Sequence, residues 1–163
     1  MNWFKNIFGK PKTEDDDILQ KFNAQMVEIK CAGKVDDGHY TDSVEKAKSL
    51  KREGKNPEAI ELLLKCVDAT EKEAKSANST PSVLDEKFAF LDKGRSESGW
   101  GVAPWYYEQL AILYRKEKQY QKEVEILERY EKQEKAPGVG PQKLAERLIK
   151  ARELLKKNAR PQI

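Results

Sequence analysis

Apolar residues recur at helical spacing in two long stretches of the chain, and each stretch is interrupted once by polar residues. Ser43 to Val67 and Trp105 to Gln133 are each typical of two amphipathic helices joined by a tight turn. Gly54 marks the turn of the first stretch, because glycine accepts a left-handed backbone at little cost. The pattern therefore predicts two helix–turn–helix units, at about residues 41–77 and 104–135.

An apolar stripe before the first unit predicts another helix, which begins after Thr13 and ends near Gly33. Phe22 to Ile29 also fits a strand, so both interpretations stay open. Asp36-Asp37-Gly38 then predicts a turn.

Residues 78–103 separate the two units and form an insert. Apolar spacing predicts a short helix over Val83–Leu91, followed by a loop rich in glycine and serine. Prolines and glycines interrupt the chain at 136–141, and a capping helix is expected over 142–157. The prediction is one helical domain at 14–157, with tails at 1–13 and 158–163.

Composition narrows the classes of protein to consider. The 163 residues are 38% hydrophobic and 36% charged, with a mean hydropathy of −0.85, which suits thin helical layers with solvated faces. The net charge of +3 is too balanced to indicate nucleic-acid binding. No secretory signal or membrane-spanning stretch is evident, and the two cysteines form no metal or disulfide pattern. We therefore expect a soluble cytoplasmic protein.

Small and large residues alternate in both units in a way that resembles the tetratricopeptide repeat. The matching positions are Ala47, Leu50, Gly54, Ala59, Leu63 and Cys66 in the first unit, and Tyr107, Leu110, Ala111, Tyr114, Tyr120 and Leu127 in the second. The resemblance implies an all-α fold of tetratricopeptide-like helix–turn–helix repeats, with an inserted short helix and loop and a C-terminal capping helix. The family's usual role is to hold other proteins.

The second unit departs from the repeat pattern at three positions. Lys118 replaces the turn glycine, Glu123 stands where alanine is usual, and Tyr130 stands where a small residue is usual. The last two are expected to loosen the close approach of the helices. Two units are also fewer than the roughly three that such folds need. The N-terminal stripe, the insert or a second copy of the chain must then supply the missing surface.

The resemblance implies that a ligand lies on the inner face lined by the first helix of each unit. The candidate positions are Val44, Lys48, Lys51 and Arg52 in one unit, and Trp105, Glu108, Ile112, Arg115 and Lys116 in the other. The cations would suit an acidic peptide or a terminal carboxylate, which arginine can hold with two parallel hydrogen bonds. The alternative is an ordinary solvated helix surface.

Two aromatic groups are further candidates. Trp100 and Trp105 belong to a cluster in which Tyr107 and Tyr114 are expected in the core, so the tryptophans either fill the core or form a contact surface. The N-terminal stripe consists of Trp3, Phe4, Ile7 and Phe8 with flanking lysines. It could touch a membrane surface or a partner groove, or it could be a disordered tail or a contribution to the core.

Residues suited to catalysis are sparse. Asp36, Asp37 and His39 could touch a metal, but a solvated turn is the simpler interpretation. No phosphate-binding loop, nucleophile motif or cofactor motif is present. The sequence therefore predicts a non-enzymatic protein-interaction module without a cofactor. A self-associating, homo-oligomeric structural protein is the alternative.

Overall fold

The computed structural model describes residues 12–93 and 99–159. In these ranges the α-helices are α1 (Glu14–Cys31), α2 (Val44–Arg52), α3 (Asn56–Ser79), α5 (Pro104–Lys116), α6 (Tyr120–Glu131) and α7 (Val139–Asn158). Two short 3-10 helices, η2 (Tyr40–Ser43) and η3 (Ala89–Asp92), accompany them. The strands β1 (Lys34–Val35) and β2 (Gly38–His39) form a small antiparallel hairpin. The prediction of an all-α protein is confirmed.

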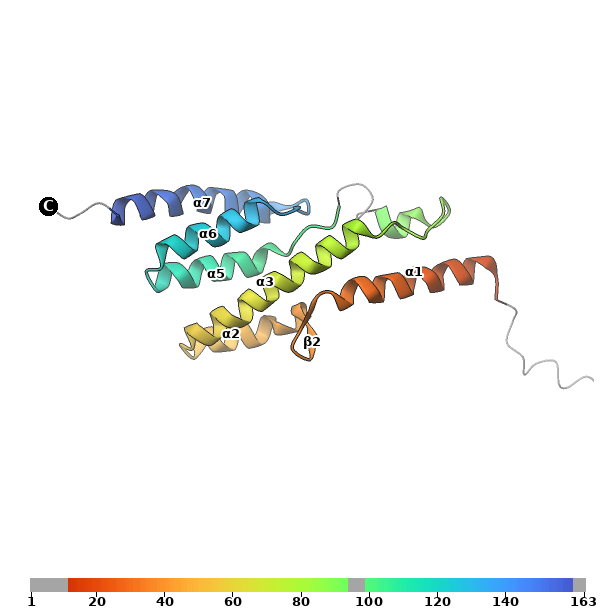
Figure 1. The fold of residues 1–163 in the computed structure, drawn as a ribbon, viewed down its shortest axis with the longest axis horizontal. Helices are drawn as coiled ribbons and strands as arrows, with labels where there is room; N and C mark the ends of the chain where they lie inside the picture. Colours follow the sequence, from red (N-terminus) through yellow and green to blue (C-terminus); the bar gives the residue numbers. More distant parts are fainter. Residues whose placement is uncertain (1–11, 94–98, 160–163) are drawn as a thin grey trace, which may run out of the picture.

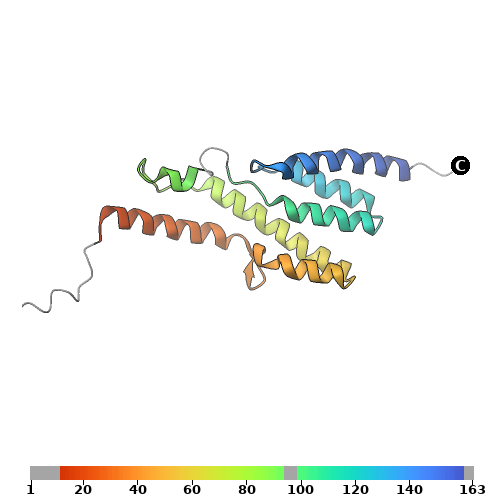
Figure 2. The same ribbon diagram turned by 180° about the vertical axis from the view of Figure 1, so that it is seen from behind.

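The helices lie side by side in chain order from α2 to α7 (Figure 1). The long helix α3 packs against α1, α2 and α5, while α6 packs between α5 and α7. Helix α1 begins and α7 ends toward opposite ends of the molecule, as the view from behind also shows (Figure 2). Helix α3 therefore joins the N-terminal elements to the second half of the chain.

The two helix hairpins, α2–α3 and α5–α6, have turns with the same backbone conformation. Gly54 has a φ of +75°, and Lys118, which lies 64 residues later, has a φ of +57°. Directly after these residues, the Lys55 and Gln119 amides donate to carbonyls of the first helix over 2.9 and 2.8 Å. The turn position was therefore predicted correctly in both units. Lys118 adopts the left-handed conformation although a side chain makes it unfavourable.

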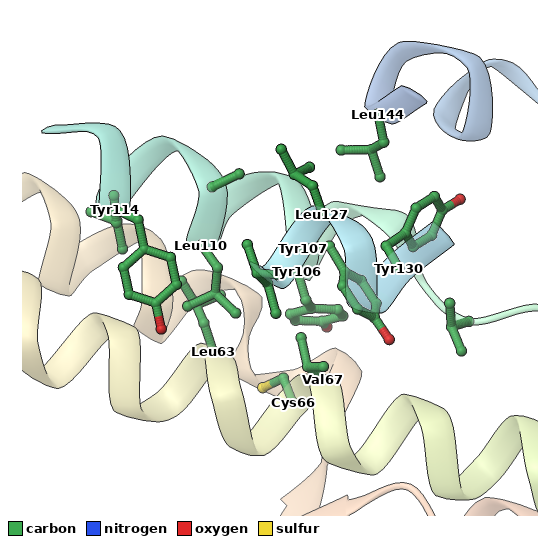
Figure 3. Packing of buried hydrophobic residues seen from close by; sticks show 14 of the residues in the cluster. Leu63, Cys66, Val67, Tyr106, Tyr107, Leu110, Tyr114, Leu127, Tyr130 and Leu144 are labelled. Carbon is green, nitrogen blue, oxygen red and sulfur yellow. The ribbon is translucent and has the colours of Figure 1, made fainter. Parts of the chain in front are cut away.

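Side chains of α3, α5, α6 and α7 form the core where the two hairpins and α7 pack together (Figure 3). Leu63 of α3 packs near Tyr107 and Leu110 of α5, and Leu127 of α6 belongs to the same cluster. These four side chains are all buried, and each contributes roughly 1.5–3 kcal/mol through removal from water. Stacking of the hairpins thus hides apolar stripes that neither could bury alone.

The N-terminal region adds a helix rather than a strand. Thr13 caps α1: its hydroxyl accepts from the Asp16 amide, and the Asp16 carboxylate accepts from the Thr13 amide. The strand interpretation of Phe22–Ile29 was wrong. Ile29 is buried, so α1 and the adjoining β-hairpin supply part of the surface that two units lack. The stripe of Trp3, Phe4, Ile7 and Phe8 lies outside the described residues.

Two expected boundaries were wrong. The helix over Val83–Leu91 is absent, and only the 3-10 helix Ala89–Asp92 forms there, since the preceding segment is almost entirely exposed and gains little from packing. The last helix begins at Val139 and not at 142, with Pro141 inside its first turn. Proline is tolerated there because the first helical amides have no partner within the helix.

Candidate functional site

Side chains of α2, α5 and α7 meet on one face, which we call the first-helix face. It is defined by residues that share one side of a helix through their spacing, which are Lys48, Lys51 and Arg52 of α2 and Trp105, Glu108, Gln109, Ile112 and Lys116 of α5. Lys143 of α7 joins it through its ion pair with Glu108. Lys51 donates to the Gln109 amide oxygen, and Lys143 pairs with Glu108 over 2.7 Å. Two lysines from distant parts of the chain therefore approach the same turn of α5.

The first-helix face carries more cations than carboxylates. Arg52 and Lys116 are exposed and have no ion pair within the described ranges. Lys48 is exposed and pairs with its neighbour Glu45 over 2.7 Å. Burial lowers the pKa of the Lys51 ammonium; Glu108 opposes this effect and Lys116 adds to it. Arg52 and Lys116 are thus the cations most available to an incoming anion.

Arg115, a candidate for the ligand-binding face, pairs with a glutamate of α6 that the sequence analysis did not assign to it. Its Nε donates to Glu123 over 2.8 Å, and Arg147 of α7 reaches the other oxygen of the same carboxylate over 3.1 Å. Glu123 is fully buried, so it needs compensating charge. The buried Glu123 is thus neutralised by two partly exposed arginines from different helices, which form an Arg–Glu–Arg triad with it. Lys143, which the sequence reasoning did not assign, is the cation that extends the first-helix face.

The aromatic candidates divide between core and periphery. Tyr107 and Tyr114 are buried, as predicted. Trp105 is half-buried and meets the edge of Tyr106 at 5.0 Å between ring centroids. Trp100 is also half-buried, and the side chain of Asn78 bonds both its amide and its carbonyl. Trp105 and the half-buried Ile112 leave apolar surface beside the cations of the first-helix face.

His39 is not the solvated turn residue that we predicted. Its Nε2 lies 2.8 Å from Glu73 Oε2, and its Nδ1 lies 2.8 Å from the hydroxyl of Thr41. The Glu73 side chain is buried, and Gly33 packs so closely that a methyl group there would clash with both partners. The pair therefore fastens the β-hairpin to α3. Within the described residues, no group of three potential metal ligands gathers here or elsewhere.

The only sign of Glu73 in the sequence was its place in a charged stretch, which predicts solvent exposure. Its histidine partner lies 34 residues earlier, so no local pattern links the two.

None of the helices in the described ranges combines the length and apolar character that crossing a membrane requires.

Comparison of the chain with models of known families, with curated proteins and with solved structures finds no match. The function must therefore be argued from the residues of this chain alone.

Proposed function

We propose that the protein is a tetratricopeptide-like interaction module that binds an acidic or extended peptide on the first-helix face. The repeated turn supports a repeat architecture, since Gly54 and Lys118 have the same backbone conformation and are followed by equivalent hydrogen bonds. The stacking of α2–α3 on α5–α6, with α7 as the last layer, also fits a short solenoid. A binding role without chemistry of its own follows from this proposal.

The observation that carries the proposal is the convergence of α2, α5 and α7 on one turn of α5. Lys51 of α2 and Lys143 of α7 bind the adjacent residues Gln109 and Glu108 of that turn. Arg52 of α2 and Lys116 of α5 are exposed cations without an ion pair within the described residues. Carboxylates of a partner would find charge-assisted donors there. The half-buried Trp105 and Ile112 would contribute apolar contact, and tryptophan is a frequent energetic centre of interfaces.

Charge reversal tests this site. The variant with Lys51→Glu, Arg52→Glu and Lys116→Glu should lose partners that the wild-type protein retains in affinity capture from its native cell. A matched control reverses the exposed lysines Lys46, Lys132 and Lys156, which lie outside the first-helix face. It changes the net charge equally and should retain the partners. Equal retention by both variants would remove the first-helix face as the binding site.

Self-association is the second candidate function. Val27, Phe90 and Val139 are exposed apolar residues, with 64%, 68% and 80% of their surface accessible. A second copy could cover such residues and complete the short stack. Static light scattering decides this alternative, because a stable monomer at micromolar concentration excludes it.

A cytoplasmic location is part of the same proposal. Cys31 and Cys66 are both free thiols, one exposed and one buried. Unpaired cysteines suit a reducing compartment. Fractionation of the native cell tests this location directly.

A further inference from the structure

A furrow runs along the seam between α3 and α6, away from the residues of the first-helix face. Two hollows make up this furrow, with volumes of about 680 and 400 Å³. Arg129 of α6 lines both, so the two hollows meet at its side chain. Their combined size is that of a peptide site and not of a single small ion.

Arg129 is held rigidly across the furrow. Its Nε and Nη2 donate to the two oxygens of Glu71 over 2.8 and 2.7 Å, and Nη2 also donates to Asp68 over 2.6 Å. The Tyr107 hydroxyl donates to the same Glu71 carboxylate over 2.7 Å. Nη1, in contrast, has no hydrogen-bond partner among the described residues. A fixed guanidinium thus offers two free N–H donors at the middle of the furrow.

The two hollows differ in chemistry. The smaller hollow has an apolar wall of Leu64, Tyr114 and Ile126, and Lys122 and Glu125 also line it. The larger hollow has the buried Ala74 and Val102 in its lining.

The larger hollow is also lined by Lys72 and Lys75 of α3. Both lysines are exposed, and neither makes an ion pair within the described part of the chain. Asp68 and Glu71, which also line this hollow, are paired with Arg129, whereas Glu134 has no ion pair within the described residues. The furrow therefore passes from an end with an apolar wall to an end whose unpaired charges are two lysines and one glutamate.

The length of the furrow fits an extended peptide. Its lining on α3 runs from Leu64 to Ser79, which is about 22 Å at a rise of about 1.5 Å per helical residue. An extended chain advances about 3.3 Å per residue, so about seven residues would fill it. The apolar end and the lysines are separated by about four extended residues on the same scale.

We propose that the α3–α6 furrow binds an extended segment of a partner protein that carries an apolar residue and, about four positions away, an acidic residue. The apolar side chain enters the hollow at Leu64, and the carboxylate pairs with Lys72 and Lys75. A main-chain carbonyl between them accepts from Nη1 of Arg129. Since the furrow shares no residue with the first-helix face, this site does not depend on the function proposed above.

Selection from a random heptapeptide library on the immobilised full chain tests the proposal. Enriched peptides should carry the apolar and acidic residues at the stated spacing. Their affinity should fall at least tenfold for the Lys72→Glu, Lys75→Glu variant. The control Lys46→Glu, Lys156→Glu has the same net charge and should bind like the wild type. Amide chemical shifts should change beside Arg129 and Lys75 when an enriched peptide is added.

Four outcomes would overturn the proposal. In the first, the library yields no enriched sequence. In the second, the enriched peptides bind the Lys72→Glu, Lys75→Glu variant as tightly as the wild type. In the third, the shift changes fall on α2 and on Lys116. This third result would instead place the peptide on the first-helix face, so the two sites are distinguished in one experiment. In the fourth, the peptide-free protein tumbles more slowly than a monomer should, and dilution changes the amide shifts of the furrow. The furrow would then bind a second copy of the chain.

Discussion

The two helix hairpins have the same backbone turn but opposite chemistry at one buried position. Ala59 of α3 and Glu123 of α6 are equivalent, since each amide donates to the residue four before it, just after the turn. Both are fully buried. Alanine lets α2 and α3 approach without further conditions, whereas glutamate requires Arg115 and Arg147. The same backbone turn is thus compatible with a buried alanine, which needs no partner, and with a buried glutamate, which needs an arginine from the next helix.

The same difference decides what the preceding helix can offer to a ligand. Lys51 occupies in α2 the place that Arg115 occupies in α5, three residues before the positive-φ turn residue. With alanine at 59, no buried carboxylate claims Lys51, and it reaches Gln109 on the first-helix face. Arg115 is held by Glu123 instead. Lys51 and Arg115 occupy equivalent positions but have different partners, because the buried residue on the following helix is alanine in one hairpin and glutamate in the other.

The largest effect on stability is expected when the buried glutamate of the second hairpin is introduced at the equivalent position of the first. Ala59→Glu places a carboxylate in a fully buried site, and Lys51, the counterpart of Arg115, is already bonded to Gln109. The substitution should lower the free energy of unfolding by more than about 4 kcal/mol. Urea denaturation followed by circular dichroism measures the loss. Ala145→Glu, on the exposed side of α7, is the control and should change stability by less than about 0.5 kcal/mol. A tolerated Ala59→Glu would show that the two sites are not as different as their partners indicate.

Removing the arginines should cost somewhat less. Arg115→Met with Arg147→Met strands the buried Glu123, and we expect a loss of about 3 kcal/mol, near the lower limit for a broken buried pair because both arginines are partly exposed. Addition of Glu123→Ala should restore most of this stability, as it recreates the chemistry of the first hairpin. Arg152→Met, which breaks a pair with the half-exposed Glu128, is the comparison and should cost less than about 1 kcal/mol. If Glu123→Ala restored nothing, the triad would not be the cause.

Alkaline pH should weaken the second hairpin through its tyrosines. Burial raises the pKa of Tyr106, and burial together with the bond to Glu71 raises the pKa of Tyr107. The folded state therefore favours the neutral phenols, and their contribution is complete below the unfolded value of about 10. It declines as pH rises further, by about 1 kcal/mol per tyrosine between pH 10 and 11.

Urea midpoints measured from pH 8 to 11 check this dependence. Tyr106→Phe keeps the ring and loses only a bond to the Tyr40 carbonyl, so it should make the alkaline decline less steep. An unchanged slope in that variant would assign the decline to other groups.

The smallest effect concerns the turns. Gly54→Lys should destabilise the first hairpin by about 1 kcal/mol, because a side chain opposes the left-handed backbone although nothing crowds the added atom. Lys118→Gly should stabilise the second by a similar or smaller amount, since glycine also gains freedom in the unfolded chain. Thermal unfolding of the two single variants and of the double swap measures both signs. Equal shifts in the same direction would contradict the equivalence of the turns.

Helical periodicity was enough to predict the hairpins and their core. Gly54 located one turn, the repeat pattern located the other at Lys118, and Tyr107 and Tyr114 were correctly expected in the core. Periodicity identifies which face of a helix is buried, because that depends on residues three and four positions apart. It does not identify which polar groups meet across helices.

The missed contacts all join residues far apart in the chain. Arg147 reaches Glu123 from the next helix, and His39 reaches Glu73 across 34 positions. The furrow between α3 and α6 likewise exists only once the two hairpins are stacked. Short-range sequence patterns do not indicate such contacts, so the pairing of Arg115 with Glu123 and the furrow were not predicted.

The exposed segment after α3 gives the molecule a natural place to be divided. Residues 81–83 are exposed, with one hydrogen bond from Gln25 of α1 to the Pro81 carbonyl, and the interface of α3 with α5 that joins the two halves does not involve them. A single proteolytic nick there would leave the first hairpin and the second bound through Leu63, Tyr107 and their neighbours. The severed chain should migrate as one particle under native conditions, and separately expressed halves should reassemble when mixed.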